Sequence, residues 1–389
     1  MNKPVQKLIL AIAVTLLTFV AGCSLPQVTA QQRTFLDLSL EFLGEYQLPK
    51  QEFQDTPIGG ISALAYDRKR DRFLALSDDQ SALAPARFYT LKIDLSDTGI
   101  KDVKVENVTF LKGQDGNTFG KYTIDPEGIA ISPQKTVFIS SEGVARNSIP
   151  PAIAEFDIQT GNLRQNFPIP QRYIPDSYDE NQQKGIQNNL ALEALTLNPT
   201  GSIPASGEPI RLFALTESAL VQDRDTVELD DKGEAKPITI KSRLLHYLVS
   251  DGPPIILSEH LYPLATPPIG AVYHGVSELL AVDRGGHFLS LERSLSFFGF
   301  NARIFQIATG AATDTSGIVS LKGELKAVQP VKKKLVLDLN ELGITLDNLE
   351  AMTFGPRLPD GSQSLILASD NNFSDKQITQ FLLFRLKIA

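Results

Sequence analysis

Acidic residues recur at both ends of five similar hairpins in this sequence. In each hairpin a short apolar strand starts at an acidic or small residue, and a second apolar strand ends in Asp or Glu. The start of the first strand and the end of the second lie at the same open end of an antiparallel hairpin, so Glu127 and Glu142 should be neighbours. The start positions are Gly59, Glu127, Glu193, His274 and Glu350, and the end positions are Asp78, Glu142, Glu217, Glu292 and Asp370.

If the five hairpins stand around one axis, eight of these carboxylates and one imidazole surround one mouth of a central channel. Like charges at close range raise one another's pKa, so a dry cluster of this kind requires a counter-charge. Ca²⁺ is suitable, because this hard cation takes about six to eight oxygen ligands with tolerant geometry. We therefore predict metal ligands at Asp78, Glu127, Glu142, Glu193, Glu217, Glu292, Glu350 and Asp370.

Softer metals are less favoured by the sequence. Cys23 is the only cysteine, and the four histidines, at 246, 260, 274 and 287, have no metal-binding spacing. Beside the predicted ligands, His274 and Arg293 are expected to contact a substrate. Together with Glu350 they are the candidate catalytic residues.

A carboxylate that recurs in every repeat can instead serve the fold, by accepting backbone N–H groups from the next turn or repeat. Function is then better sought where the repeat is broken. The residues that depart from the repeat are Gly59, Asp79, His274, Arg293, Asn371 and Asn372.

The spacing of the hairpins predicts the architecture that positions these residues. Successive copies are about 70 residues apart, which is the scale of a four-stranded β unit. Further strand-like runs lie between them, at Arg87–Leu95, Ile153–Ile158, Phe167–Ile169, Leu244–Val249, Ile255–Leu261, Arg303–Ile307 and Lys334–Leu339. The prediction is an all-β β-propeller of five four-stranded blades, with a sixth blade after Ser294 as the alternative.

The two ends of the domain should close this ring. Only one strand, Gln380–Ile388, follows the last hairpin, and a spare strand, Glu41–Leu48, precedes the first. An N-terminal strand that pairs with the C-terminal blade leaves no long exposed sheet edge, which limits aggregation.

Composition and missing motifs exclude several classes of function. A formal net charge of −8 argues against nucleic acid as a partner, because phosphate binding needs a basic surface. The sequence contains no Gly-x-Ser-x-Gly elbow, no P-loop, no Gly-x-Gly-x-x-Gly and no His-Glu-x-x-His. Serine-triad hydrolysis and nucleotide chemistry therefore have no support, and no organic cofactor is predicted.

The N-terminal residues have the pattern of an export signal. Lys3 and Lys7 precede an apolar run, residues 8–20, that is too short for a membrane span. Residues 20–23, Val-Ala-Gly-Cys, resemble the lipobox of bacterial lipoproteins, which implies that Cys23 is lipidated. We expect a signal peptide at 1–22, a lipidated tether at 23–33 and one domain at 34–389. Ser24 points to the periplasmic face of the outer membrane.

Several segments carry a resemblance to a known family. PEGIAISP, FISSEG, GIQNNLALEALTLNP and DNLEAMTFGPRLPDGSQSLILASDNNF resemble the phytase-like domain family, described as having "esterase-like activity of phytase". The resemblance covers about Gly59 to Phe384. Ala194 and Ala351 depart from it, because the family usually has Gly after the Glu.

The resemblance implies a propeller with calcium-dependent phosphomonoester hydrolysis, in which a metal-activated water is the nucleophile. The predicted mouth has few bases for an anionic substrate, namely Arg293, Arg146 and Arg224. Three hypotheses follow: a metal-dependent hydrolase of small anionic phosphoesters or other esters, a non-catalytic propeller that binds a ligand or protein at the outer membrane, and a lactonase-like or sugar-ester enzyme.

Overall fold

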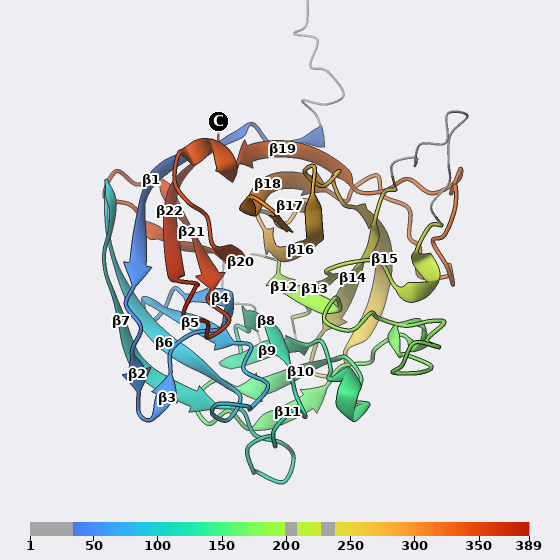
Figure 1. Cartoon of the computed structure of the whole chain (residues 1–389), viewed down its shortest axis with the longest axis horizontal. Helices are drawn as coiled ribbons and strands as arrows, with labels where there is room; N and C mark the ends of the chain where they lie inside the picture. Colours follow the sequence, from blue (N-terminus) through green and yellow to red (C-terminus); the bar gives the residue numbers. More distant parts are fainter. Residues whose placement is uncertain (1–33, 199–207, 227–237, 389) are drawn as a thin grey trace, which may run out of the picture.

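The computed structural model describes residues 34–198, 208–226 and 238–388 (Figure 1). Within this part of the chain, five four-stranded antiparallel sheets stand as blades around a central axis. The predicted five-bladed β-propeller is confirmed. The expected signal peptide, the lipidation at Cys23 and the tether lie outside the described residues.

The strands of each blade are given from the innermost strand to the outermost one. Blade 1 contains β4 (Ile61–Asp67), β5 (Arg72–Ser77), β6 (Arg87–Ser96) and β7 (Gly99–Phe110). Blade 2 contains β8 (Pro126–Ile131), β9 (Thr136–Ser141), β10 (Ala152–Asp157) and β11 (Leu163–Asn166). Blade 3 contains β12 (Leu192–Leu197), β13 (Ile210–Thr216), β14 (Lys241–Val249) and β15 (Ile255–Pro263).

Blade 4 contains β16 (Ala271–Ala281), β17 (His287–Ser296), β18 (Gly299–Ala308) and β19 (Lys332–Asp338). Blade 5 contains β20 (Asn348–Arg357), β21 (Gln363–Asp370), β22 (Thr379–Ile388) and β1 (Leu38–Leu48). The residues after Ser294 complete blade 4 and do not form a sixth blade. The minor elements are the hairpin β2 (Glu52–Phe53) and β3 (Thr56–Pro57), and the 3₁₀ helices η1 (Ala145–Asn147), η2 (Gln171–Tyr173), η3 (Val221–Asp223) and η4 (Leu339–Leu342).

The ring is closed as the sequence predicts. β1 pairs antiparallel with β22 along its whole length, from Leu38 opposite Ile388 to Leu48 opposite Thr379. Figure 1 shows β1 lying beside β22 at the edge of blade 5. The first strand therefore completes the last blade, and both ends of the domain are held in one sheet.

Local turn chemistry shapes the inner hairpins. The backbones of Asp71, Lys135 and Gly286, in the turns between the first two strands of blades 1, 2 and 4, have positive φ angles of 53°, 66° and 87°. Asp67 and Asp283 accept backbone N–H groups two residues further along the chain, as in Asx-turns. These turns fix which side chains reach the opposite, open end of each hairpin.

Apolar layers between the blades form the core. The Phe167 ring lies 5.4 Å from Phe138 and 5.6 Å from Tyr247, which joins blades 2 and 3. The rings of Phe213 and Phe288 lie 4.8 Å apart in a T-shaped contact between blades 3 and 4. Aromatic pairs of this geometry stabilise the packing of neighbouring sheets beyond their buried area.

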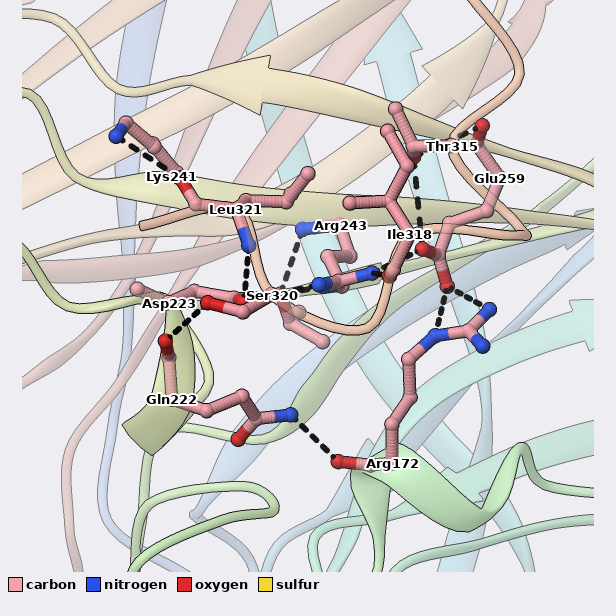
Figure 2. A network of polar contacts seen from close by, with 12 residues as sticks. Arg172, Gln222, Asp223, Lys241, Arg243, Glu259, Thr315, Ile318, Ser320 and Leu321 are labelled. Carbon is pink, nitrogen blue, oxygen red and sulfur yellow. Dashed lines mark hydrogen bonds and ion pairs between the residues drawn. The ribbon is translucent and has the colours of Figure 1, made fainter. Parts of the chain in front are cut away.

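A largely buried ionic network ties the outer part of blade 3 to the connection that precedes β19 (Figure 2). Arg243 of β14 donates to both oxygens of Asp223, at 2.6 and 2.9 Å, and also to Glu259 of β15. Arg172 and Tyr173 of η2 donate to the same Glu259, at 3.0 and 2.8 Å. Arg172, Asp223, Arg243 and Glu259 all have charged partners within the network, so none of them is left open for a ligand.

No helix among the described residues is both long and apolar enough to cross a membrane.

Candidate functional site

Each innermost strand carries an irregularity near its start. The pairing with the second strand skips residues between Ile61 and Ala63 in blade 1 and at the equivalent points of the other four blades. Such β-bulges re-aim a side chain. The skipped residues include Ser62, Glu127, Glu193, Ser277 and Glu350.

Three of these bulge residues are acidic, and their buried carboxylates line the cavity at one end of the channel. The serines take a structural part instead. Ser62 Oγ donates to the carbonyl of Pro126 at 3.3 Å, and Ser277 Oγ donates to the carbonyl of Leu349 at 3.3 Å. The bulge position is therefore a cavity-lining acid in blades 2, 3 and 5. In blades 1 and 4 it is a serine that hydrogen-bonds to the next blade.

The two predicted start positions in blades 1 and 4 are three residues too early. Gly59 makes room for another residue, because a Cβ there would lie 2.5 Å from Asn371 Oδ1. His274 does not line the cavity, since its Nε2 lies 2.8 Å from the carbonyl oxygen of Ala265. Burial lowers the pKa of this imidazole. The predicted catalytic role of His274 is not supported, because its side chain lies outside the cavity lining.

A second position of the acidic ring lies on or just after the second strand of each blade, one residue beyond the partner of the residue that precedes the bulge. It is Asp78, Glu142, Glu217 and Asp370 in four blades, and Arg293 in blade 4. The sequence alignment assigns Glu292 to this position, but Glu292 itself pairs with Val276. A one-residue shift in a strand turns the side chain to the other face.

Glu292 is therefore not a ligand in the ring, and this prediction is wrong. Its carboxylate accepts a hydrogen bond from Tyr262 Oη at 2.6 Å and forms an ion pair with Lys333. None of these three residues lines the cavity. The structure places Arg293 in the ring instead, as the one basic member among four acids.

The ring opens into a cavity of about 830 Å³. The predicted residues that line it are Asp78, Glu127, Glu142, Glu193, Arg293, Glu350 and Asp370, and Glu217 lies just behind them. Asp125, which the sequence analysis missed, joins them as a lining residue. It directly precedes the Pro-Glu start of β8, so an acid next to a start position was the available signal.

Arg293 lies among the acids of one half of the ring. Its Nη2 is 2.8 Å from Glu350, 3.2 Å from Glu217 and 3.4 Å from Glu193, and its Nη1 donates to Asn348 Oδ1 at 2.7 Å. The guanidinium carbon also lies 4.9 Å from the centre of the Tyr273 ring. One fixed cation thus neutralises part of a cluster that holds seven or more carboxylates.

Burial and mutual repulsion raise the pKa of the ring carboxyls. Burial, followed by the charge of Glu350, raises the pKa of Asp78 to about 8. Burial also raises the pKa values of Asp125 and Glu217 to about 7. The pKa values of Glu127 and Glu142 lie well above their usual range for the same reason. Without a further cation the ring holds protons at neutral pH.

This arrangement predicts an unusual pH dependence of stability. An acid whose pKa is raised on folding retains a proton that the unfolded chain loses above about pH 4.5, so the free energy of unfolding falls as pH rises. In calcium-free buffer, stability should decrease between about pH 5 and pH 8, by about 1.4 kcal/mol per pH unit for each retained proton. Urea unfolding at several pH values measures this. A flat profile across that range would contradict the protonated ring.

The carboxylates form three groups that could hold a cation. Within each group, one oxygen per residue lies within 4.8 Å of the others. The groups are Asp125 with Glu127 and Glu142, Glu127 with Glu193 and Glu350, and Glu142 with Glu193 and Glu217. The second and third share Glu193 with the ion pairs of Arg293. Asp125, Glu127 and Glu142 have no such pair with it, so they form the best cation site.

The donor set of this first group fits Ca²⁺. All three residues are buried and offer only carboxylate oxygens, and Asn189 and Asn348 also line the cavity. Gln80 Nε2 donates to Asp125 Oδ2 at 2.7 Å, and the Ala191 N–H donates to Glu142. These hydrogen bonds orient two of the three carboxylates, as outer partners do in known metal sites.

Substitutions in this group should abolish calcium-dependent stabilisation. Calcium at about 100 times its Kd should raise the free energy of unfolding of the wild type by about 2.7 kcal/mol. Glu127→Gln should lose most of this increment, because the neutral amide binds a divalent cation more weakly. Thermal unfolding with and without calcium measures the increment. Glu292→Gln is the matched control and should keep it, and equal increments in the two variants would contradict the assignment.

Other residues that break the repeat mainly support the site. The carboxylate of Asp79 accepts the N–H groups of Ala82, Leu83 and Ala84 and pairs with the buried Arg87 at 2.8 Å. Asn371 Oδ1 accepts the N–H groups of Gly60 and Phe373. Asn372 lines the cavity.

The two other predicted bases do not line the cavity. Arg146 donates a hydrogen bond to Gln80 Oε1 at 2.6 Å, and Gln80 in turn contacts Asp125. Arg224 is exposed.

Comparison with known proteins identifies the family. The model of the phytase-like family, "Esterase-like activity of phytase", matches residues 56–373. The chain belongs to this family. The match includes blades 1 to 4, both inner strands of blade 5 and every residue of the ring. No protein in a search of the curated proteins matches this phytase-like chain.

Solved structures that resemble this phytase-like protein are distant. The catalytic domain of the Coprinopsis cinerea GH62 α-L-arabinofuranosidase is 10% identical, with 90% of this chain and 97% of that chain covered and a TM-score of 0.38. An α-L-arabinofuranosidase of Podospora anserina is 10% identical, with 91% and 98% covered and a TM-score of 0.36. At these TM-scores the matches carry no argument about the chemistry of this chain.

Proposed function

We propose that this phytase-like protein is a cation-dependent hydrolase of esters, phosphoesters included, that acts in the acidic cavity. One observation carries the proposal. Three buried carboxylates, of Asp125, Glu127 and Glu142, converge without an ion pair to Arg293, beside a half of the ring in which Arg293 supplies a fixed positive charge. A cation site next to a guanidinium is suited to an ester with an anionic or polarised oxygen.

Each side chain has a separate task in this proposal. Asp125, Glu127 and Glu142 would hold Ca²⁺, which when bound polarises an ester oxygen and lowers the pKa of a coordinated water. Arg293 orients the ester through its guanidinium, which Asn348 and Glu350 hold in place at 2.7 and 2.8 Å. Burial raises the pKa of Glu350, which favours the protonated form of its carboxyl and suits it to donate a proton.

The proposal is tested by assaying the purified domain with p-nitrophenyl phosphate, p-nitrophenyl acetate and a panel of lactones. We expect hydrolysis that EDTA abolishes and Ca²⁺ restores, and loss of turnover in Glu127→Gln. The substrate that is hydrolysed separates phosphoesterase, esterase and lactonase activity. If no substrate is hydrolysed with any divalent cation, the proposal is rejected and a non-catalytic binding propeller is favoured.

We also propose that the protein is anchored to the cell envelope through Cys23. The geometry of blade 5 supports this arrangement. β1 starts at Leu38, opposite Ile388, which is the end of the blade away from Asp370 and the cavity. An anchor that precedes Leu38 would join the domain at the end of blade 5 that lies away from the cavity. Incorporation of labelled palmitate into the wild type, but not into Cys23→Ala, tests the anchor.

A further inference from the structure

An apolar row of side chains forms one wall of the cavity. Tyr273, Leu295 and Phe300 lie opposite one another on β16, β17 and β18, and all three line the cavity. Leu295 follows Arg293 by two residues, so the two side chains lie on the same face of β17. The row therefore runs from the guanidinium outward across blade 4.

A second apolar surface faces the cavity from blades 1 and 5. Ala82 and Leu83, in the loop that Asp79 holds, line it together with Phe373. The Leu83 side chain is 60% exposed, although the three hydrogen bonds to Asp79 fix its loop. Together these side chains add a second apolar surface to the cavity, and ligand sites are lined mainly by apolar side chains.

The charge of the lining limits what can bind between these walls. Among the described residues that line the cavity, Arg293 is the only basic one, and eight are acidic. With one cation held by Asp125, Glu127 and Glu142, that cation and Arg293 are the only positive groups of the described lining that can face an anionic ester. A substrate with many phosphate groups would be repelled, because like charges in a site cost free energy.

From these observations we infer that the substrate is amphiphilic, with a single ester or phosphoester group at Arg293 and an alkyl or aryl group against Tyr273, Leu295 and Phe300. This inference rests on the proposed function and names its substrate class. Leu295 and Phe300 are then specificity-determining residues that contact the apolar part of the substrate. Neither residue takes part in the chemical step.

Binding of stable phosphonates tests the inference without any turnover. Calorimetric titration of the calcium-containing protein should show that hexylphosphonate binds at least about tenfold more tightly than methylphosphonate, because each buried methylene adds affinity. Phe300→Ser and Leu295→Ser should each reduce this preference to less than about threefold. Phe298→Ser is the matched control, because Phe298 is 95% exposed on the same hairpin, does not line the cavity and should leave the preference unchanged.

The outcomes separate this inference from the proposed function. A chain-length preference that Phe300→Ser removes, in a protein that hydrolyses none of the test esters, would support the apolar wall and reject the hydrolase. Equal binding of the two phosphonates, no binding of either, or tighter binding of inositol hexakisphosphate than of hexylphosphonate would overturn the inference. Circular dichroism of each variant shows whether it is folded.

Discussion

Arg293→Met should destabilise the calcium-free protein by roughly 3–5 kcal/mol at about pH 8, which is the usual cost of removing one partner from a buried ionic cluster. Glu193, Glu217 and Glu350 would lose the guanidinium that lies 2.8–3.4 Å from them. At about pH 5 the loss should be much smaller, since burial raises the pKa values of these carboxyls and fewer of them are ionised there. Urea unfolding at both pH values measures the difference.

The same variant should lose ester hydrolysis by a factor of about 100 or more, because the positive charge that orients the ester is gone. Arg303→Met is the matched control, since Arg303 lies on the neighbouring strand β18, does not line the cavity, and donates its guanidinium N–H to the carbonyl of Thr266. It should change stability little and activity not at all. A pH-independent loss of stability in Arg293→Met would show that the methionine disturbs packing and that charge is not the cause.

Arg243→Leu should lower the free energy of unfolding by roughly 3–5 kcal/mol without touching the cavity. The substitution leaves Asp223 without its two hydrogen bonds from the guanidinium and leaves Glu259 with Arg172 as its remaining cation (Figure 2). Both carboxylates are fully buried, so water cannot replace the lost contacts. Chemical denaturation measures the change.

Lys326→Ala provides the control for this prediction. Lys326 and its partner Glu324 are 82% and 80% exposed, and an exposed pair contributes at most about 1 kcal/mol. Affinity for calcium should be unchanged in both variants, because neither residue lines the cavity. An Arg243→Leu protein that is as stable as the wild type would mean that the network contributes no net stability.

The repeat in the sequence predicted the fold well because it records backbone geometry. Apolar strands joined by turn residues, at a period of about 70 residues, determine four-stranded blades with little dependence on detail. The spare N-terminal strand and the missing C-terminal one likewise predicted that β1 pairs with β22. These features depend on patterning over many residues, so an error at one position does not change the prediction.

The site was less predictable because it depends on register. In blade 4 the pairing of β16 with β17 continues past the bulge at Ser277 as far as Ala271, so Arg293 lies inside a paired strand and not at its end. Matching residue types alone selects Glu292, whereas strand pairing selects Arg293. Asp125 lies just before the repeated pattern, so no alignment of the repeats includes it. Among the residues that break the repeat, Arg293 stands at the centre of the site, while Gly59, His274 and Asn371 do not line it.

A calorimetric titration of the purified domain with calcium at about pH 7, repeated in buffers of different ionisation enthalpy, tests the central claim most directly. The raised pKa values of Asp125, Glu127 and Glu142 mean that protons must leave when a cation binds. We predict saturable binding with a net release of protons, both lost in Glu127→Gln. A folded wild-type domain that binds no calcium, or binds it without releasing protons, would contradict the account.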